Sequence, residues 1–324
     1  MKKLIITAAA AGALLLAGCA PTPAAPAGEE VDFPKKGSNI ELIVPFTAGG
    51  TTDITARAFA TVLADELGVN VEVINTPGAG GQIGLTALAA ASPDGYTIGF
   101  TNLPSSIPTY LVENRGATYD AESFVPIGSL TRTTNYIAVS DASPYETLED
   151  LLEAAGDAPG SITVGVAGDD ERLGVEAAAA LADVEFNVVP FDGGSEKTTA
   201  LLGNQVDVII GGGTTVVPGV KNGDFRALGI FGGQKDPFLP DIPTFTSLGI
   251  DIDINGFLVV SAPAGTPDAI IAIFEKAVEA AVEDQTFQDL VNAGFQEPQF
   301  LGSAEISDVW KGQEDTFREQ LAAE

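Results

Sequence analysis

The sequence predicts an α/β protein of two domains, with helices flanking a mainly parallel sheet in each domain. Apolar, strand-like runs alternate with helix-like runs along most of the chain. Its 324 residues are enough for two domains that each bury a core. The 37 Gly and 20 Pro are spread along the chain, as in a globular protein.

The first domain begins with a strand-loop-helix order that repeats. The expected elements are a strand over 40–46, a helix over 53–68, a strand over 69–76, a helix over 82–91 and a strand over 96–102. An Asp94-Gly95 turn precedes the last of these strands. Because helices separate the strands, the strands are expected to run parallel.

The second domain begins near the strand "NYIAVS" and repeats the strand-helix rhythm through "SITVGVAG", "FNVVPF" and "VDVIIGGG". A strand and a long helix over 255–284 then suggest a return to the first domain. We therefore expect crossing strands near 136–140 and 256–260, and a cleft between the domains in which a small ligand binds. The predicted domains are 37–138 plus 257–324 for domain 1, and 139–256 for domain 2.

The N-terminus has the pattern of an export signal. Lys2 and Lys3 precede a short apolar run that ends in Leu-Ala-Gly-Cys. This motif resembles the lipobox of bacterial lipoproteins, which implies a signal peptide over 1–18 and a lipid on Cys19, the sole Cys. The Pro- and Ala-rich residues 19–36 are then a tether that anchors the domains outside the cell membrane. The alternative is an ordinary signal peptide with a chance Cys.

The formal net charge of −30 makes nucleic acid and anionic membrane surfaces poor partners. An anion site in this chain must therefore be local, built from amides, hydroxyls and helix ends. The acidity can also serve solubility alone.

A glycine cluster, "NTPGAGGQIG", lies at a predicted strand-to-helix junction. It fails as a dinucleotide fingerprint because Ile83 occupies the position of the third glycine, which arrives one residue late at Gly84. It fails as a P-loop because no Lys-Ser/Thr pair follows the glycines.

A second such junction, "FTAGGTTD", precedes the first helix. Both junctions follow strands at their carboxyl ends, where open α/β sheets bind ligands. Together they can hold a carboxylate with neutral groups: the amides of Gly49, Gly50, Gly80 and Gly81, and the hydroxyls of Thr47, Thr51 and Thr52. The alternative is that the glycines only make tight turns. Asp53 either caps the first helix or fixes the loop around a ligand.

At these residues the chain resembles the Bug-type extracytoplasmic receptors, the substrate-binding proteins of tripartite tricarboxylate transporters. The similarity extends from "IELIVPFTAGGTTD" through "VPFDGGSEKTTALLGNQVDVIIGG" to "APAGTPDAIIAIFEKAV". It implies a periplasmic-binding-protein-like clamshell that closes on a small carboxylated solute and delivers it to membrane permease subunits. It also implies two glycine loops in domain 1, a strand end at Asn102, and facing loops at 168–172, 191–195 and 211–215. The candidate ligand-binding residues are Phe46, Thr47, Gly49, Gly50, Thr51, Thr52, Asp53, Gly78, Ala79, Gly80, Gly81, Gln82, Asn102, Gly168, Asp169, Asp170, Arg172, Phe191, Asp192 and Gly213.

The chain departs from the family pattern where relatives commonly carry small or hydroxyl residues after "GVAG". Here the residues are Asp169, Asp170, Glu171 and Arg172. Arg172 is suited to a second carboxylate, and either aspartate to a ligand amine or cation. The alternative is a solvated helix start. This departure leaves the identity of the solute open.

An enzyme on a similar fold is the competing class. The chain has no His, and its sole Cys is assigned to the lipid, so His-based catalysis and Cys- or His-based metal sites are excluded. We therefore predict a monomeric binding protein with no cofactor, no catalytic residues and no metal. A sensory receptor that reports its ligand to a membrane signalling partner would use the same site.

Overall fold

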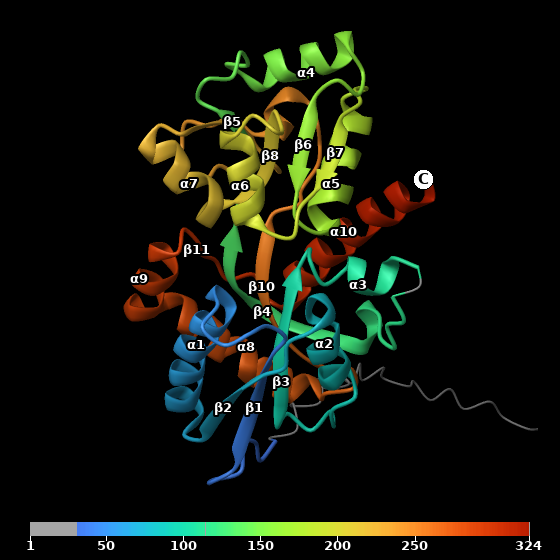
Figure 1. Ribbon diagram of the computed structural model, residues 1–324. Helices are drawn as coiled ribbons and strands as arrows, with labels where there is room; N and C mark the ends of the chain where they lie inside the picture. Colours follow the sequence, from blue (N-terminus) through green and yellow to red (C-terminus); the bar gives the residue numbers. More distant parts are fainter. Residues whose placement is uncertain (1–30, 114, 324) are drawn as a thin grey trace, which may run out of the picture.

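The computed structural model describes residues 31–113 and 115–323. Figure 1 shows two halves, each built on one sheet, with β1 to β4 in the lower half and β5 to β8 in the upper. The first sheet has the strand order β11-β4-β10-β3-β1-β2 and the second β7-β6-β8-β5-β9. The predicted two-domain α/β clamshell is confirmed by this architecture and by the solved structures described below.

The lower half takes residues from both ends of the described chain. Its strands are β1 (Asn39–Val44), β2 (Asn70–Asn75), β3 (Thr97–Leu103), β4 (Phe124–Thr133), β10 (Gly256–Pro263) and β11 (Glu297–Pro298). Its helices are α1 (Thr51–Leu67), α2 (Gln82–Ala89), α3 (Pro108–Leu111), α8 (Asp268–Glu283), α9 (Gln285–Ala293) and α10 (Ser303–Ala323), with short 3-10 turns η1 (Ala79–Gly81) and η2 (Ala121–Ser123).

The upper half is one continuous segment of chain. Its strands are β5 (Asn135–Ser140), β6 (Thr163–Val166), β7 (Asn187–Pro190), β8 (Val208–Gly212) and β9 (Phe225–Ile230). Its helices are α4 (Leu148–Asp157), α5 (Asp169–Leu181), α6 (Gly194–Leu202) and α7 (Gly213–Asn222), followed by the 3-10 turn η3 (Phe245–Leu248).

The apolar pattern of β1 explains why helices cover both faces of the first sheet. Ile40, Leu42 and Val44 are fully buried and belong to one core cluster with α1 and α8. Ile43 belongs to the other cluster, together with Leu85 of α2. Successive strand residues point to opposite faces, so an apolar run of this kind indicates a strand covered on both sides.

Both sheets are mixed, where the sequence predicts mainly parallel ones. The β1–β2, β1–β3, β6–β7 and β6–β8 pairs are parallel, as expected from helical crossovers. The β3–β10, β4–β10, β5–β8 and β5–β9 pairs are antiparallel. The antiparallel strands β4, β5 and β10 flank the points where the chain passes between the halves, so their direction is fixed by the crossing rather than by a crossover helix.

The chain crosses between the halves at Thr134, between β4 and β5, and at Asn255, just before β10. The two crossings are bonded to each other. The backbone amide of Asn135 donates to Asn255 Oδ1 over 3.0 Å, and Asn135 Nδ2 donates to the Ile254 carbonyl over 2.6 Å. These contacts make one compact connection between the two halves.

The predicted signal peptide, Cys19 and most of the predicted tether lie outside the described residues. Where the description begins, Phe33 packs against Tyr96 and Phe274, with ring centroids 5.3 and 5.5 Å apart. The last residues assigned to the tether thus already contact the first domain. Over residues 31–113 and 115–323, no helix combines the length and apolar character needed to span a membrane.

Candidate functional site

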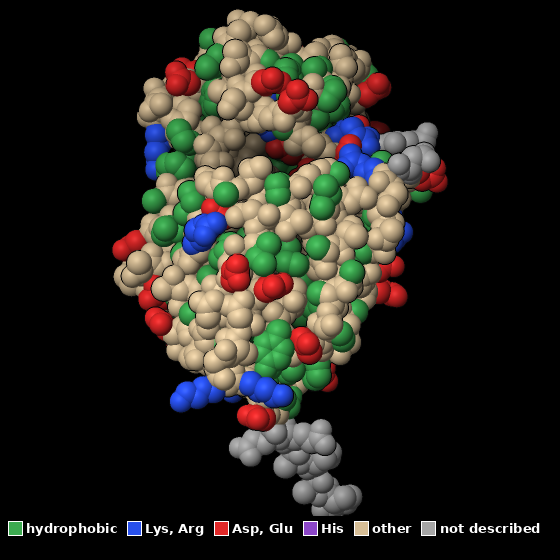
Figure 2. Space-filling view, turned by 60° about the horizontal axis from the view of Figure 1, so that its bottom comes forward, with side chains coloured by type: hydrophobic (Ala, Val, Ile, Leu, Met, Phe, Trp, Pro, Cys, Tyr) green, Lys and Arg blue, Asp and Glu red, His purple; other side chains and the backbone are tan. Residues whose placement is uncertain are grey.

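A cavity of about 170 Å³ lies where the two halves meet. The space-filling view shows the surface hollowed between the upper and lower parts (Figure 2). The first half contributes the α1 start, the β3 end and β10, and the second half the starts of β5 and α5. The lining residues are Thr52, Asn102, Leu103, Pro104, Ser105, Thr133, Asn135, Asp170, Gly256, Phe257, Leu258 and Gln296.

The cavity brings together three of the predicted site residues: Thr52, Asn102 and Asp170. Their positions are 50 and 68 residues apart in sequence, and Asp170 comes from the opposite domain. A site at the carboxyl end of a strand, facing a second domain, is the usual place for a small ligand in such folds.

The first glycine loop is held by the side chain of Asp53. One carboxylate oxygen accepts the Gly49 amide over 2.8 Å, and Arg57 donates to both oxygens over 3.1 and 2.9 Å. Asn75 Nδ2 donates to Asp53 Oδ1 over 3.0 Å and to the Phe46 carbonyl over 3.1 Å. Hydrogen bonds from Arg57 and Gly49 lower the pKa of Asp53 to about 2. With both oxygens engaged and the residue only 3% exposed, Asp53 positions the loop.

The second glycine loop depends on backbone that favours glycine. Gly78, Gly80 and Gly81 have φ angles of +132°, +67° and +98°. The Gly81 amide donates to the Gly78 carbonyl over 3.0 Å, which closes the turn. Ala79, at φ +49°, and Gly80 are exposed at the tip. The amides of Gly49 and Gly81, which the sequence suggests for a ligand, therefore bond within the protein here.

Helices α1 and α2 follow the neighbouring strands β1 and β2, and both begin without side-chain caps. Their N-cap residues are Gly50 and Gly81, and neither helix start receives a capping hydrogen bond from that residue's side chain. The first-turn N–H groups of a helix have no intrahelical acceptor and carry partial positive charge. The hydroxyl-bearing Thr47, Thr51 and Thr52 lie at the first of these starts, with Thr47 and Thr51 exposed. This arrangement suits an anionic group.

Two amide side chains in the lining carry a buried, unpaired oxygen. Asn102 Nδ2 donates to Thr52 Oγ1 over 3.5 Å, and Gln296 Nε2 donates to Thr133 Oγ1 over 3.3 Å. With the two side-chain amides turned so that their nitrogens make these bonds, Asn102 Oδ1 and Gln296 Oε1 have no partner among the described residues. Buried acceptors of this kind are normally satisfied, so each of these oxygens is an unmet hydrogen-bonding group in a residue of the cavity lining.

Helix α5 brings acidic residues to the opposite wall. Its N-cap is Gly168, at φ +107°, and a Cβ there would lie 2.7 Å from Asp170 Oδ1. Burial, and next the charge of Glu171, raise the pKa of Asp170 to about 7. The glycine thus makes room for a carboxylate that is poorly solvated in the cavity wall.

The neighbours of Asp170 have partners within the protein. Asp169 pairs with Arg115, which joins the two halves, and Arg115 also accepts a bond at its carbonyl from Gln82 Nε2 over 3.0 Å. Glu171 pairs with the buried Lys197 over 2.5 Å and accepts the Ala167 amide over 2.6 Å. Burial raises the pKa of Glu171, and Lys197 opposes that shift.

Arg172 donates to Glu176 over 2.8 Å and lies 3.8 Å from Asp169. Its guanidinium is therefore engaged along its own helix rather than placed on the cavity wall. This geometry argues against Arg172 as the group that receives a second ligand carboxylate.

Besides Gly168, Asp169 and Arg172, three further predicted residues in the second half do not line the cavity. Phe191 lines a separate shallow hollow and packs within 3.1 Å of the Cβ position of Gly165. Asp192 is exposed, and its amide donates to Glu196 over 3.3 Å. Gly213 is buried, and a Cβ there would lie 2.6 Å from the Phe295 carbonyl. Its glycine thus permits close packing between halves.

Sequence reasoning missed the polar lining residues Ser105, Thr133, Asn135 and Gln296, and also the glycine and apolar lining residues Leu103, Pro104, Gly256, Phe257 and Leu258. The expected crossing near 136–140 pointed to the neighbourhood of Thr133 and Asn135, because crossings border the cleft. Ser105 follows the predicted strand end at Asn102. Gln296 reaches the cavity from the segment after α9, and no local pattern marks it.

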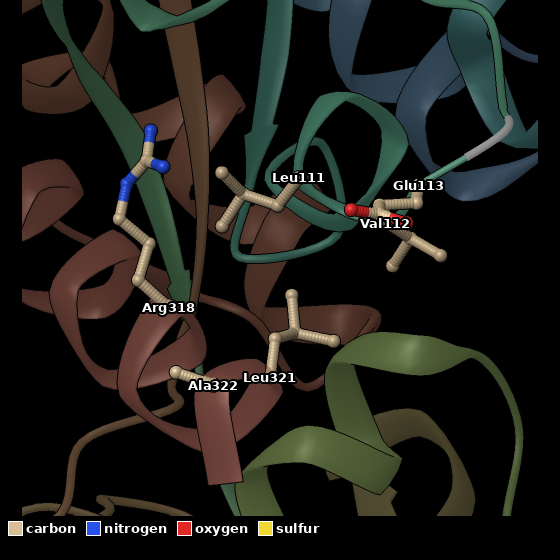
Figure 3. Close-up of a pocket in the computed structure, with 6 residues that line it drawn as sticks. All are labelled: Leu111, Val112, Glu113, Arg318, Leu321 and Ala322. Carbon is tan, nitrogen blue, oxygen red and sulfur yellow. The ribbon is translucent and has the colours of Figure 1, made fainter. Parts of the chain in front are cut away.

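A larger hollow, of about 450 Å³, lies between the end of α3 and the end of α10. Figure 3 shows Leu111 and Leu321 pointing toward it, with Arg318 and Glu113 at its sides. It contains none of the predicted site residues and lies at the C-terminal end of α10, where the helix dipole disfavours an anion. It is therefore a poor candidate for a carboxylate site.

No group of His, Cys, Asp and Glu suited to a metal ion occurs in the described parts of the chain.

Comparison with known proteins identifies the family to which the chain belongs. Residues 55–313 match the TctC model, described as the tripartite tricarboxylate transporter family receptor. The chain is 30% identical to the UPF0065 protein in the gbd 5'region of Cupriavidus necator, over 93% of this chain and 89% of that protein. It is 28% identical to Protein BugT of Bordetella pertussis, over 76% of this chain and 77% of BugT.

Solved structures of similar proteins support the same family assignment. A TctC solute binding protein from Polaromonas, solved with no ligand, superposes with a TM-score of 0.82 at 26% identity, covering 90% of this chain and 100% of that one. An R. palustris protein with adipate superposes with a TM-score of 0.69 at 25% identity, covering 89% and 97%. The matched family is one of transporter receptors, and the Polaromonas protein is a solute-binding protein, so the comparisons point to a binding protein and not to an enzyme. The chain therefore belongs to the family of Bug-type receptors of tripartite tricarboxylate transporters.

Proposed function

We propose that the chain is an extracytoplasmic receptor that captures a small carboxylated solute between its domains and delivers it to the permease subunits of a tripartite tricarboxylate transporter. The observation that carries this proposal is the polar cavity between the halves, at the end of β3 and beside the uncapped start of α1. Family membership supports the transport role over the sensory alternative.

The carboxylate binds in domain 1. It lies against the starts of α1 and α2, where Thr47, Thr51 and Thr52 supply hydroxyls and the helix ends supply partial positive charge. Asn102 borders the same space. Asp53 and Asn75 keep the first loop in position without touching the solute.

Domain 2 contacts the other end of the solute through the residues at the start of α5, from Gly168 onward. We take the moving units to be the two predicted domains, 37–138 plus 257–324 and 139–256, with their boundaries shifted to the crossings at Thr134 and Asn255 so that β5 stays within one unit. A solute that contacts both units favours the closed arrangement by the contacts it gains there. The connection through Asn135 and Asn255 stays intact as the units move.

The size of the cavity favours a small solute. Its volume of about 170 Å³ is below the roughly 300–1,000 Å³ typical of sites for drug-sized ligands. Adipate, present in the R. palustris structure, is an example of a solute of suitable size and chemistry.

We further propose that Cys19 carries a lipid that retains the mature chain at the cell membrane, with residues 19–36 as the tether. The chain acts as a monomer in this proposal. The LAGC motif and the lone Cys support the lipid anchor.

The experiment is a thermal-shift and calorimetric panel of mono-, di- and tricarboxylates and amino acids on the purified soluble chain, beginning at residue 31. A binder raises the melting temperature with its concentration. The expected result is saturable binding of at least one small carboxylate, with the uncharged amide of that compound inactive. Mass spectrometry of any solute retained through purification would identify it directly. If neither method finds a carboxylate, the proposed function is wrong.

A further inference from the structure

We propose that Asp170 receives a cationic amine of the bound solute, so that this receptor selects amino carboxylates over dicarboxylates of the same length. The inference rests on the proposed function, because it assigns the second end of a solute whose first end is a carboxylate.

The charge on the cavity wall is the first argument. Among the described residues that line the cavity, Asp170 alone carries a charged side chain, and the others are neutral. A dicarboxylate would place its second negative charge near this group without a Lys or Arg in the lining to offset it. A cationic amine would instead find an opposite charge, which is the arrangement that stabilises an ion in a partly buried site.

The second argument is that, within residues 31–113 and 115–323, no Lys or Arg forms an ion pair with Asp170. Asp169 is paired with Arg115, and Glu171 with Lys197. The amides at the start of α5 and the more distant charge of Lys197 favour the ionised form of Asp170, but burial outweighs them. A bound amine would supply the missing positive charge. Of the acids in the first turn of α5, only Asp170 reaches the cavity.

Two buried, unpaired oxygens of lining residues are consistent with a cationic amine in the cavity. Asn102 Oδ1 and Gln296 Oε1 are both acceptors, both buried and both without a partner among the described residues. An ammonium group has several N–H donors and no acceptor, so it satisfies acceptors and a carboxylate together. A second carboxylate has no N–H to offer them.

The two ends of the cleft thus differ in charge preference. The start of α1, which reaches the lining through Thr52, suits an anion, whereas the wall at Asp170 suits a cation. A solute with a carboxylate at one end and an amine at the other matches both. The competing interpretation is a protonated Asp170 that donates a hydrogen bond to a second carboxylate, and the experiment below separates the two.

The test uses paired probes on the soluble chain from residue 31. Adipate and 5-aminopentanoate have the same methylene chain and one carboxylate in common, and differ in the charge at the far end. Glutarate and 4-aminobutanoate form a shorter pair. Dissociation constants are measured by calorimetry at pH 8 for the wild type and for Asp170→Asn. Asp157→Asn is the matched control, because Asp157 is an exposed acid at the end of α4, in the same domain and far from the cleft (Figure 1).

We expect the wild type to bind the amino member of at least one pair at least tenfold more tightly than the dicarboxylate, in line with about 1.5–3 kcal/mol for a hydrogen bond to a charged group. Asp170→Asn should reduce that preference at least tenfold, and Asp157→Asn should leave it unchanged. Circular dichroism checks that each variant is folded, and Asp170→Ser serves as a second neutral variant.

Tighter binding of the dicarboxylate by the wild type, or an unchanged preference in both Asp170 variants, would overturn the inference and leave the proposed function intact. Tighter dicarboxylate binding that weakens in Asp170→Asn would identify the protonated-donor mechanism in its place. If none of the probes binds and the wider carboxylate panel also fails, the proposed function and the inference fall together.

Discussion

Asn255 Oδ1 accepts a 3.0 Å hydrogen bond from the backbone amide of Asn135, so the two segments that connect the domains are bonded to each other. Asn255 is fully buried, and its Nδ2 also donates to the Phe231 carbonyl over 2.6 Å. Its own carbonyl accepts from Gln313 Nε2 over 2.9 Å, which adds α10 to the same connection. The connection is therefore centred on one residue, whose side-chain oxygen, side-chain nitrogen and backbone carbonyl all have partners.

Replacement of Asn255 by Ala should destabilise the protein. It leaves the Asn135 amide and the Phe231 carbonyl buried without these partners, and each such group costs about 1–3 kcal/mol. We expect a loss of about 2–4 kcal/mol in the free energy of unfolding, measured by urea denaturation. Asn292→Ala, at an exposed position on α9, is the control and should change little. A loss below about 0.5 kcal/mol for Asn255→Ala would mean that this connection is not a stabilising element.

The low pKa of Asp53 gives a stability that depends on pH. Its pKa is about 2 in the folded protein and 3.8 in the reference state, so the folded protein binds protons less readily. The stabilisation is therefore complete above about pH 5 and is lost as the pH falls toward 2. Asp53→Asn should lower the melting temperature at pH 7, and the difference from wild type should shrink with falling pH. Asp65→Asn, an exposed acid on the same helix, should show no such trend. A constant difference from pH 7 to pH 3 would contradict the assignment.

The second glycine loop is predicted to be needed for binding. Gly81→Val places a β-branched residue at φ +98°, a conformation that such residues avoid. Space is adequate, because the nearest atom to a Cβ there is Pro45 Cβ at 3.5 Å, so the backbone turn is what changes. We expect affinity for the bound carboxylate to fall at least tenfold while circular dichroism remains that of a folded protein. Unchanged affinity would remove this loop from the site.

Membrane retention is predicted to depend on Cys19. The LAGC motif implies a lipid on this residue, and the chain has no other Cys. Cys19→Ser should move the expressed chain from the membrane fraction to the soluble extracytoplasmic fraction, measured by fractionation and immunoblot. Gly18→Ala, within the same motif, is a milder comparison that retains the thiol. Full membrane association of the serine variant would exclude the lipid anchor.

Local patterns predict a large part of this fold. The alternation that places Ile40, Leu42 and Val44 on one face is visible in the sequence, and so are the helix end at Gly68 and the buried stripe of α8 that includes Phe274. These features depend on neighbours in sequence, through strand and helix periodicity. The position of the two glycine junctions follows from the same local order.

The remaining features depend on contacts between distant residues. The strand β4 is absent from the sequence prediction, and its antiparallel pairing with β10 joins residues more than a hundred positions apart. The cavity also depends on residues that are distant in sequence. Gln296 lies near Asn102 and Asp170 only because the chain crosses between the domains twice. The pairing of Glu171 with Lys197, which isolates Asp170 as the remaining acid, is also a tertiary contact. A single sequence carries no periodic pattern that predicts contacts between such distant residues.

If the domains close on a carboxylate, the protein becomes more compact, and small-angle X-ray scattering of the soluble chain detects that change. Scattering is recorded without solute and with a saturating concentration of the tightest carboxylate from the panel. We expect a smaller radius of gyration with solute, and no such change for Gly81→Val at the same concentration. An unchanged radius of gyration for the saturated wild type, with binding verified by calorimetry in the same sample, would contradict domain closure.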